Sequence, residues 1–229
     1  MATTRRTKAE QSHHTRRALL DIARTLFTAQ GYAATSLEEI TRRAGVTRGA
    51  ISYHFRDKAG LFEAVFDEVR NEYLAALRTD IAAVDGDAWQ RLMTGVELFL
   101  AAILDPSVRR IVYIDGPAVL VDWSSEQRRA PAIALLRAIF EPLMDAGLID
   151  RLPLDALLRQ LWALFFNAAV DVAHAEEGGI ALHERVVVLR RILTGLRPLV
   201  SSSVDRRAVQ KQEGSDSGSG SPPSPTRIR

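Results

Sequence analysis

Polar side chains follow a helical spacing between residues 47 and 58, and their types suit contact with DNA bases. An apolar pair, Ile51 and Phe55, predicts that this segment is a short helix with one buried side. An α-helix fits the major groove of DNA, where an arginine can pair with guanine through two hydrogen bonds. The outward residues expected to contact base edges are Arg48, Gly49 and Ser52, with Tyr53 and His54 beside them.

Two hydroxyl groups, those of Thr35 and Ser36, precede an earlier short helix. Glu38 and Glu39 follow them by three residues each, so the segment contains two overlapping capping boxes. The first turn of a helix offers free backbone N–H groups and the positive end of the helix dipole, and both attract phosphate. Thr35 and Ser36 are therefore predicted to cap this helix and to contact the DNA backbone.

The segment Ala44-Gly45-Val46-Thr47 joins these two short helices. It provides a small residue where the helices touch, a glycine that can adopt a positive φ and then an apolar anchor, which is the pattern of a helix-turn-helix. Thr47 can cap the second helix, and we include it among the DNA contacts. A longer helix that starts near Ser12 or Thr15 and ends at Gly31 precedes the pair. Helix pairs with a glycine turn also occur in structural bundles, so the spacing alone leaves that alternative open.

Basic residues are concentrated at the N-terminal end of the chain. The first 60 residues contain 11 Lys and Arg against 5 Asp and Glu, a balance of +6, whereas the remaining residues carry −4. Affinity for DNA comes mainly from clustered Lys and Arg, so this distribution favours nucleic-acid binding at one end of the chain. A basic surface that contacts only solvent is the alternative.

The 229 residues divide by composition into four segments. Almost every periodic stretch has helical spacing, which predicts an all-α protein of about nine helices. We expect a basic arm at 1–14, a three-helix DNA-binding domain with the helix-turn-helix at 15–60, a larger helical ligand-binding and dimerisation domain at 61–200, and a disordered tail at 201–229. The arm residues Arg5, Arg6 and Lys8 either enter a minor groove or stay unbound. The basic residues of the tail have the same two alternatives.

Aromatic side chains occur close to polar ones in the middle of the chain. A cavity with apolar walls and a few polar groups is the usual form of a small-molecule site. We expect such a cavity for a planar or hydrophobic ligand, although most of these aromatic residues would fit an ordinary core equally well. The candidate residues are Phe99, Tyr113, Asp115, Trp123, Trp162, Phe166 and Asn167.

The last two long helices, predicted over 154–177 and 182–200, are apolar over more than one stripe. Val187, Val188 and Ile192 widen the apolar face of the second helix. More apolar surface than one core requires implies a partner, and two copies would pack as a four-helix interface about a two-fold axis. A core formed within one chain is the alternative.

Several classes of protein are disfavoured by what the sequence lacks. The absence of cysteine excludes disulfides, thiol nucleophiles and iron–sulfur clusters. Apolar stretches are interrupted by charges well before about 20 residues, so we expect a cytoplasmic protein that does not contact the membrane. The sequence contains no glycine-rich phosphate loop, nucleophile elbow or i,i+4 metal-ligand pair, and we predict no catalytic residue, metal or cofactor. An enzyme that uses Asp115, Asp171 and His174 is the alternative from a different class.

Short motifs between Thr15 and Val69 occur in a characteristic order and spacing. They are Arg17-Ala18-Leu19-Leu20, Leu26-Phe27, Gly31-Tyr32, Thr35-Ser36-Leu37, Ile40, Ala44-Gly45-Val46, Gly49, Ser52-Tyr53-His54-Phe55, Lys58 and Leu61-Phe62. This order resembles that of the TetR-type one-component transcriptional regulators. The stretch 112–120 is also similar to a segment common in one group of these regulators.

The resemblance implies a homodimer that binds a roughly palindromic operator on double-stranded DNA and releases it when a small-molecule inducer binds the larger domain. It also implies phosphate contacts for Tyr53, His54 and Lys58. The helix that begins near Lys58 would link the two domains, so a ligand that moves its far end would change the spacing of the two recognition helices, which must stay near about 34 Å. A ligand-modulated activator and a protein that coats DNA without sequence preference are the alternatives.

Overall fold

The computed structural model describes residues 7–123 and 125–198, and across these residues the chain forms helices without a strand. The predicted all-α class is therefore confirmed. The helices belong to one compact unit, Met1–Arg197. Arg5, Arg6 and the tail predicted over 201–229 lie outside the described residues.

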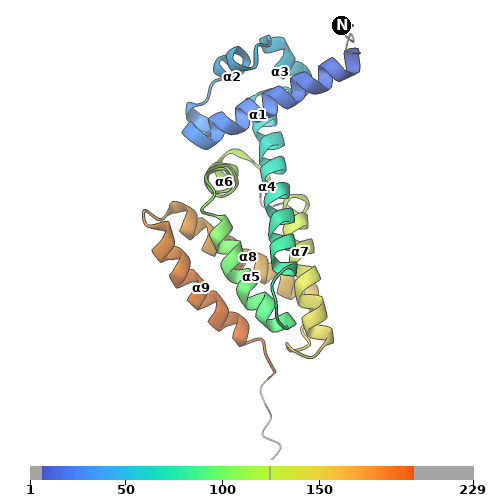
Figure 1. Cartoon of the computed structure of the whole chain (residues 1–229), viewed down its shortest axis with the longest axis vertical. Helices are drawn as coiled ribbons and strands as arrows, with labels where there is room; N and C mark the ends of the chain where they lie inside the picture. The colour runs from blue at the N-terminus through green and yellow to red at the C-terminus, as the bar shows by residue number, and fades with distance from the viewer. Residues whose placement is uncertain (1–6, 124, 199–229) are drawn as a thin grey trace, which may run out of the picture. The chain divides into compact units, whose positions relative to one another are not determined.

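Three helices form an N-terminal module: α1 (Lys8–Ala34), α2 (Leu37–Ala44) and α3 (Arg48–Phe55) (Figure 1). Helix α1 begins earlier than predicted because Thr7 and Glu10 form a capping box, in which each side chain accepts a backbone N–H of the other, at 3.2 and 2.7 Å. Lys8 is thus part of α1, and the helix occupies much of the segment predicted as an arm. Gly31 interrupts α1 with φ 81°, as the sequence indicates.

The helix-turn-helix forms where the sequence places it. Ser36 Oγ accepts the Glu39 N–H at 3.1 Å and starts α2. Gly45 ends α2 in the left-handed region, with φ 64° and ψ 31°, which glycine adopts without strain. Ile40 of α2 and Ile51 of α3 are completely or almost completely buried, at 0% and 1% exposure, so the two short helices are held by a shared core.

Helix α4 (Lys58–Ala82) connects the module to the rest of the chain (Figure 1). Its first half packs into the module, where Phe62 meets Phe27 edge-on with ring centroids 5.2 Å apart. Helix α4 also contacts α5 (Ala88–Ala102) and α7 (Glu126–Asp145). One helix therefore contributes to both cores, as the sequence predicts for a linking helix.

The larger part of the fold, here called the body, contains the remaining helices. After α5 the chain forms a π-helix, η1 (Val108–Asp115), and a short α6 (Gly116–Val119), followed by α7, α8 (Leu154–His174) and α9 (Gly178–Thr194). Helix α7 begins after Ser125, which caps it by accepting the Arg128 N–H at 3.3 Å. Helix α9 begins at Gly178, four residues before the start at 182 that the sequence predicts.

Helix α8 corrects one expectation from the sequence. By length and composition it is apolar enough to cross a membrane, with 39% of its most apolar window buried, although the sequence was expected to contain no such segment. The core helix of a soluble protein meets the same criterion. In the structure α8 packs against α7, α9 and η1, and its residues Leu158, Ala169 and Ala173 are completely buried.

Candidate functional site

The outer face of α3 carries the predicted polar residues. Arg48, Gly49, Ser52 and Tyr53 are all exposed, and the Tyr53 ring is 79% exposed with the His54 ring edge-on 4.8 Å away. A large aromatic side chain that leaves its ring in water contributes little to the core. The face therefore presents hydrogen-bonding and basic groups outward, as the sequence predicts.

Arg48 reaches back to α2 in the structure. Its Nη1 lies 3.2 Å from Glu38 Oε1, and the two side chains are 73% and 67% exposed. Exposed ion pairs contribute at most about 1 kcal/mol because water screens them. The Arg48 guanidinium can exchange this partner for a base edge at little cost.

Three of the predicted DNA contacts, Thr35, Ser36 and Thr47, have hydroxyl groups in different environments. Thr35 is 1% exposed, donates to the Gly31 carbonyl oxygen at 2.7 Å and accepts from Gln30 Nε2 at 3.3 Å. It serves to hold the end of α1, so the predicted phosphate contact by its side chain is not supported. Ser36 is exposed at the start of α2, and Thr47 is exposed at the start of α3, where its hydroxyl makes no cap bond.

Lys58 lies at the junction of α1 and α4. Its Nζ is 4.2 Å from the centroid of the Tyr32 ring, which is cation–π distance. Partial burial lowers the pKa of Lys58, and the charge of Asp115 opposes that shift. The Lys58 side chain is therefore partly engaged within the protein, unlike those of Arg48 and Tyr53.

A basic residue missing from the predicted set follows α3 directly. The side chain of Arg56 is 82% exposed and pairs with Asp57 at 3.1 Å, and Arg56 has a positive φ of 72°, uncommon for a non-glycine residue. It extends the polar face beyond the end of the helix. The sequence signal was its basic side chain immediately after the recognition segment.

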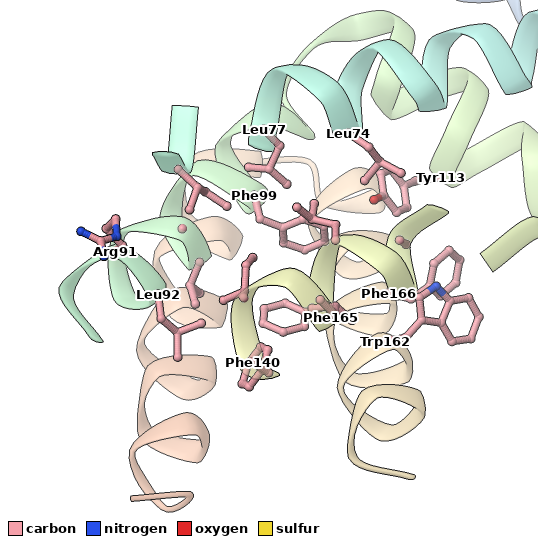
Figure 2. Close-up of a pocket in the computed structure, with 17 residues that line it drawn as sticks. Leu74, Leu77, Arg91, Leu92, Phe99, Tyr113, Phe140, Trp162, Phe165 and Phe166 are labelled. Atoms are coloured by element: carbon pink, nitrogen blue, oxygen red, sulfur yellow. The ribbon is translucent and has the colours of Figure 1, made fainter. Parts of the chain in front are cut away.

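A cavity of about 90 Å³ lies in the body among α4, α5, η1, α7 and α8 (Figure 2). Four predicted ligand residues line it: Phe99, Tyr113, Trp162 and Phe166. The lining residues that the sequence analysis missed are chiefly aliphatic, and they come from α4, α5, α7 and α8. They are Leu74, Leu77, Ile81, Arg91, Leu92, Gly95, Val96, Ala132, Leu135, Leu136, Ile139, Phe140 and Phe165.

Three predicted ligand residues do not line this cavity. Trp123 packs against the rings of Phe166 and Trp162, with centroids 4.2 and 5.8 Å apart, and contacts the cavity only through these lining residues. Asn167 is exposed on α8 because it follows Phe166 by one residue and so lies on another side of the helix. Asp115 is buried but contacts the N-terminal module instead. The structure places these three residues outside the wall of this cavity, and their role in ligand binding stays a prediction.

Tyr113 supplies a polar group to the cavity wall. Its hydroxyl lies 3.5 Å from that of Tyr73, and burial raises the pKa of Tyr113 from 10.0 to about 12. Tyr113 donates its single O–H proton to the Tyr73 hydroxyl, so toward a ligand its oxygen can accept a hydrogen bond. Tyr73 is also buried, and its pKa is raised for the same reason.

Asp115 joins η1 to the end of α1. Its Oδ2 accepts the Tyr32 backbone N–H at 2.8 Å and the Arg110 Nε–H at 3.2 Å. The Arg110 guanidinium packs so closely on Gly31 that a Cβ there would overlap it. Tyr113 lines the cavity two residues before Asp115, so one helix contacts both the cavity and the N-terminal module.

The outer face of α9 is apolar. Ile180, Val187, Val188 and Ile192 are each between 44% and 58% exposed, while Leu189 and Leu193 of the same helix are buried. Single exposed aliphatic residues are common, but several along one helix are typical of an interaction surface. We refer to these four residues as the α9 face.

Two family models match the chain. "Bacterial regulatory proteins, tetR family" covers residues 19–65, and "Tetracyclin repressor-like, C-terminal domain" covers residues 89–196. The first match contains the helix-turn-helix, and the second contains most of the cavity lining. The chain is also similar to curated transcriptional regulators.

The relatives differ in how much of their length is aligned. The chain is 44% identical to the regulator AcrR of Shigella flexneri and 37% identical to TtgR of Pseudomonas putida, but these alignments span only 40% and 51% of those proteins. It is 46% identical over 203 residues to the repressor BepR of Brucella suis, covering 84% of this chain and 96% of BepR.

A solved structure gives the same result. A TetR-family transcriptional regulator from Pectobacterium atrosepticum superposes with a TM-score of 0.76 and 31% identity, over 85% of this chain and 99% of the other. The similarity extends over the module and the body together, and the helix-turn-helix lies within the matched part. The chain belongs to the TetR family of helix-turn-helix transcriptional regulators.

Proposed function

We propose that the protein is a cytoplasmic repressor that binds a palindromic operator as a homodimer and leaves it when a small molecule enters the body cavity. The observation that carries the proposal is the position of η1, which lines the cavity with Tyr113 and holds the Tyr32 N–H with Asp115. BepR, which aligns with this chain over 96% of its own length, is named a transcriptional repressor.

DNA recognition is assigned to the exposed face of α3. Arg48, Gly49 and Ser52 approach base edges, with Arg48 exchanging Glu38 for guanine. The phosphate contacts come from Ser36, Thr47, Tyr53, His54 and Lys58, joined by Arg56. The exposure of Ser36, Thr47, Tyr53 and Arg56 supports these roles, and those of His54 and Lys58 rest on the family resemblance.

The dimer is assigned to α8 and α9. Two copies of the α9 face would bury its four aliphatic side chains against each other. The two-fold axis of such a dimer matches the symmetry of a palindrome, since each recognition helix reads one half-site.

The coupling follows from the C-terminal end of η1, which carries both Tyr113 and Asp115. A ligand that displaces Tyr113 moves η1, and Asp115 then pulls on or releases the Tyr32 N–H at the end of α1. Because α2 begins only five residues after Tyr32, the orientation of the helix-turn-helix changes with it. Ligand binding and operator binding are thus reciprocally coupled and oppose each other.

The alternative of an enzyme finds little support in the geometry. Asp115 bonds Tyr32, Asp171 pairs with Arg185 at 3.0 Å, and His174 Nδ1 lies 2.9 Å from the Val170 carbonyl oxygen, so each of the three has a separate partner. A ligand-modulated activator would use the same surfaces, but ligand binding would raise its affinity for the operator.

The test is selection of bound sequences from a random DNA pool with the purified protein, in parallel with Arg48→Ala and the distant control Arg159→Ala. The proposal predicts an enriched inverted repeat for the wild type and the control, with altered or lost enrichment for Arg48→Ala. An enriched site without internal symmetry would contradict the palindrome. Absence of enrichment with an intact fold would contradict specific recognition.

A further inference from the structure

The cavity wall contains a single charged side chain, Arg91, on the first turns of α5. The other 16 lining residues are apolar apart from the Tyr113 hydroxyl and the Trp162 indole N–H, and no carboxylate is among them. Figure 2 shows Arg91 at the opposite end of the cavity from Tyr113 and Trp162. The cavity therefore has an apolar middle and a cation at one end.

The Arg91 guanidinium lies at the rim of the cavity, on the side away from the labelled aromatic residues, and most of its N–H groups have no partner among the described residues. The guanidinium donates one hydrogen bond, from Nη1 to the Gly86 carbonyl oxygen, and no ion pair of the described residues includes it. A guanidinium has five N–H donors. The neighbouring carboxylates have other partners, because Asp87 accepts the Gln90 N–H at 2.8 Å and Glu97 pairs with Arg190 at 2.7 Å.

We propose that the cavity binds compact hydrophobic anions, with the apolar part of the ligand among the aromatic rings and its carboxylate on Arg91. The inference rests on the proposed function of this cavity as the ligand site. A charge in an apolar cavity is unfavourable unless it is paired, and a guanidinium binds a carboxylate through two parallel hydrogen bonds. A ligand cation would find no carboxylate and would be repelled by Arg91.

Aromatic rings attract cations as well, but here they are engaged with each other. Phe99 meets Phe165 edge-on at 5.3 Å, and Phe166 lies between Trp162 at 5.5 Å and Trp123 at 4.2 Å. Few ring faces are left for a cation–π contact. The arrangement of the rings therefore does not offset the repulsion by Arg91.

The size of the cavity limits the ligand. A volume of about 90 Å³ is below the roughly 150 Å³ that holds a benzene molecule in an apolar protein cavity. Even a ligand with a single ring therefore requires the side chains that line the cavity to move apart. Larger ligands require the helices to separate.

The test measures binding of three matched compounds by titration calorimetry: 3-phenylpropionate, 3-phenylpropan-1-ol and 3-phenylpropylamine. The carboxylate is expected to bind about tenfold or more tightly than the other two, because a hydrogen bond to a charged partner is stronger than a neutral one. Arg91→Ala should reduce its affinity to that of the alcohol, Arg91→Lys should retain part of the preference, and Arg159→Ala should behave as the wild type.

A second variant locates the site. Ala132→Phe narrows the cavity and should weaken the binding of all three compounds. An unchanged affinity for the carboxylate would mean that it binds Arg91 from outside the cavity, and this result would overturn the proposal. Equal or tighter binding of the alcohol or the amine, a carboxylate preference that survives Arg91→Ala, or no binding of any compound would also overturn it.

The outcomes separate this inference from the repressor proposal. An alcohol that binds as tightly as the carboxylate and still releases the operator contradicts only the ligand class. A carboxylate that binds through Arg91 but leaves operator affinity unchanged contradicts only the repressor mechanism.

Discussion

Helix α3 and helix η1 present their functional side chains in opposite directions. Tyr53 of α3 is 79% exposed, whereas Tyr113 of η1 is 6% exposed and lines the cavity. On α3 the apolar residues pack inward and leave the functional ones to solvent, so function and core can be told apart by spacing. In the body the functional wall and the core consist of the same aromatic and aliphatic residues, and only their packing distinguishes them.

The largest effects are expected in the two cores. Phe27 of the module and Phe140 of the body are both 0% exposed, and replacing either with alanine should reduce the free energy of unfolding by about 3–5 kcal/mol. Because α4 contributes to both cores, we expect a single unfolding transition that shifts as a whole in urea for both variants. Two separate transitions, only one of them shifted, would show that the regions fold independently.

The next effect concerns the α9 face. Val188→Glu with Ile192→Glu should place two charges in the proposed dimer interface, where burial without partners is strongly unfavourable. We expect monomers in sedimentation equilibrium and a fall in operator affinity of about a hundredfold or more. Leu152→Glu changes an exposed aliphatic residue outside α9 and serves as the matched control. A dimer that persists in the double variant would place the interface elsewhere.

Arg48 and Tyr53 lie on one face of α3, but their substitutions should affect DNA binding in different ways. Arg48→Ala should cost about 1–3 kcal/mol at one base position and relax specificity there. Tyr53→Ala should weaken binding to all sequences alike, because it contacts phosphate in our proposal. Competition titrations with operators changed at single base pairs distinguish the two. A uniform loss with Arg48→Ala would remove it from base recognition.

These assignments show where sequence is sufficient. The helix-turn-helix was predicted because Ser36 and Gly45 determine helix ends locally, and Ile51 and Phe55 show the buried side of α3. The positions of Asp115, Trp123 and Asn167 outside the cavity wall could not be predicted, because they depend on which helices surround η1 and α8. Thr35 was misassigned, since its neighbour Ser36 takes the cap and leaves Thr35 to bond the Gly31 carbonyl oxygen.

The connection between the two regions can be weakened at Asp115. Asp115→Ala removes the acceptor of the Tyr32 N–H and of Arg110, at a cost of about 1–3 kcal/mol. Asp115→Asn keeps an acceptor for Tyr32 and should have a smaller effect. Since the chain has no cysteine, single spin labels on α3 of each protomer can report the spacing of the recognition helices, which we expect to broaden most in Asp115→Ala. An unchanged distribution would exclude this joint from the coupling.

The smallest expected effect is a fall in the free energy of unfolding at alkaline pH. Unfolded Tyr113 ionises above pH 10, but the folded protein keeps its proton until about pH 12. Stability therefore falls as pH rises through this window, by about 1.4 kcal/mol from Tyr113 at pH 11. Urea unfolding at pH 8 and pH 11 should show a smaller loss for Tyr113→Phe than for the wild type. Equal losses in both proteins would mean that Tyr113 is accessible to water.

Sequence-specific recognition by the α3 face is tested most directly by the affinity ratio between the selected operator and random DNA, measured at one salt concentration. An operator-binding regulator is expected to prefer its site by about a thousandfold or more. We expect a ratio of that size for the wild type and a smaller ratio for Arg48→Ala. Equal affinity for both DNAs would contradict it and would instead describe a protein that binds DNA only through its charge.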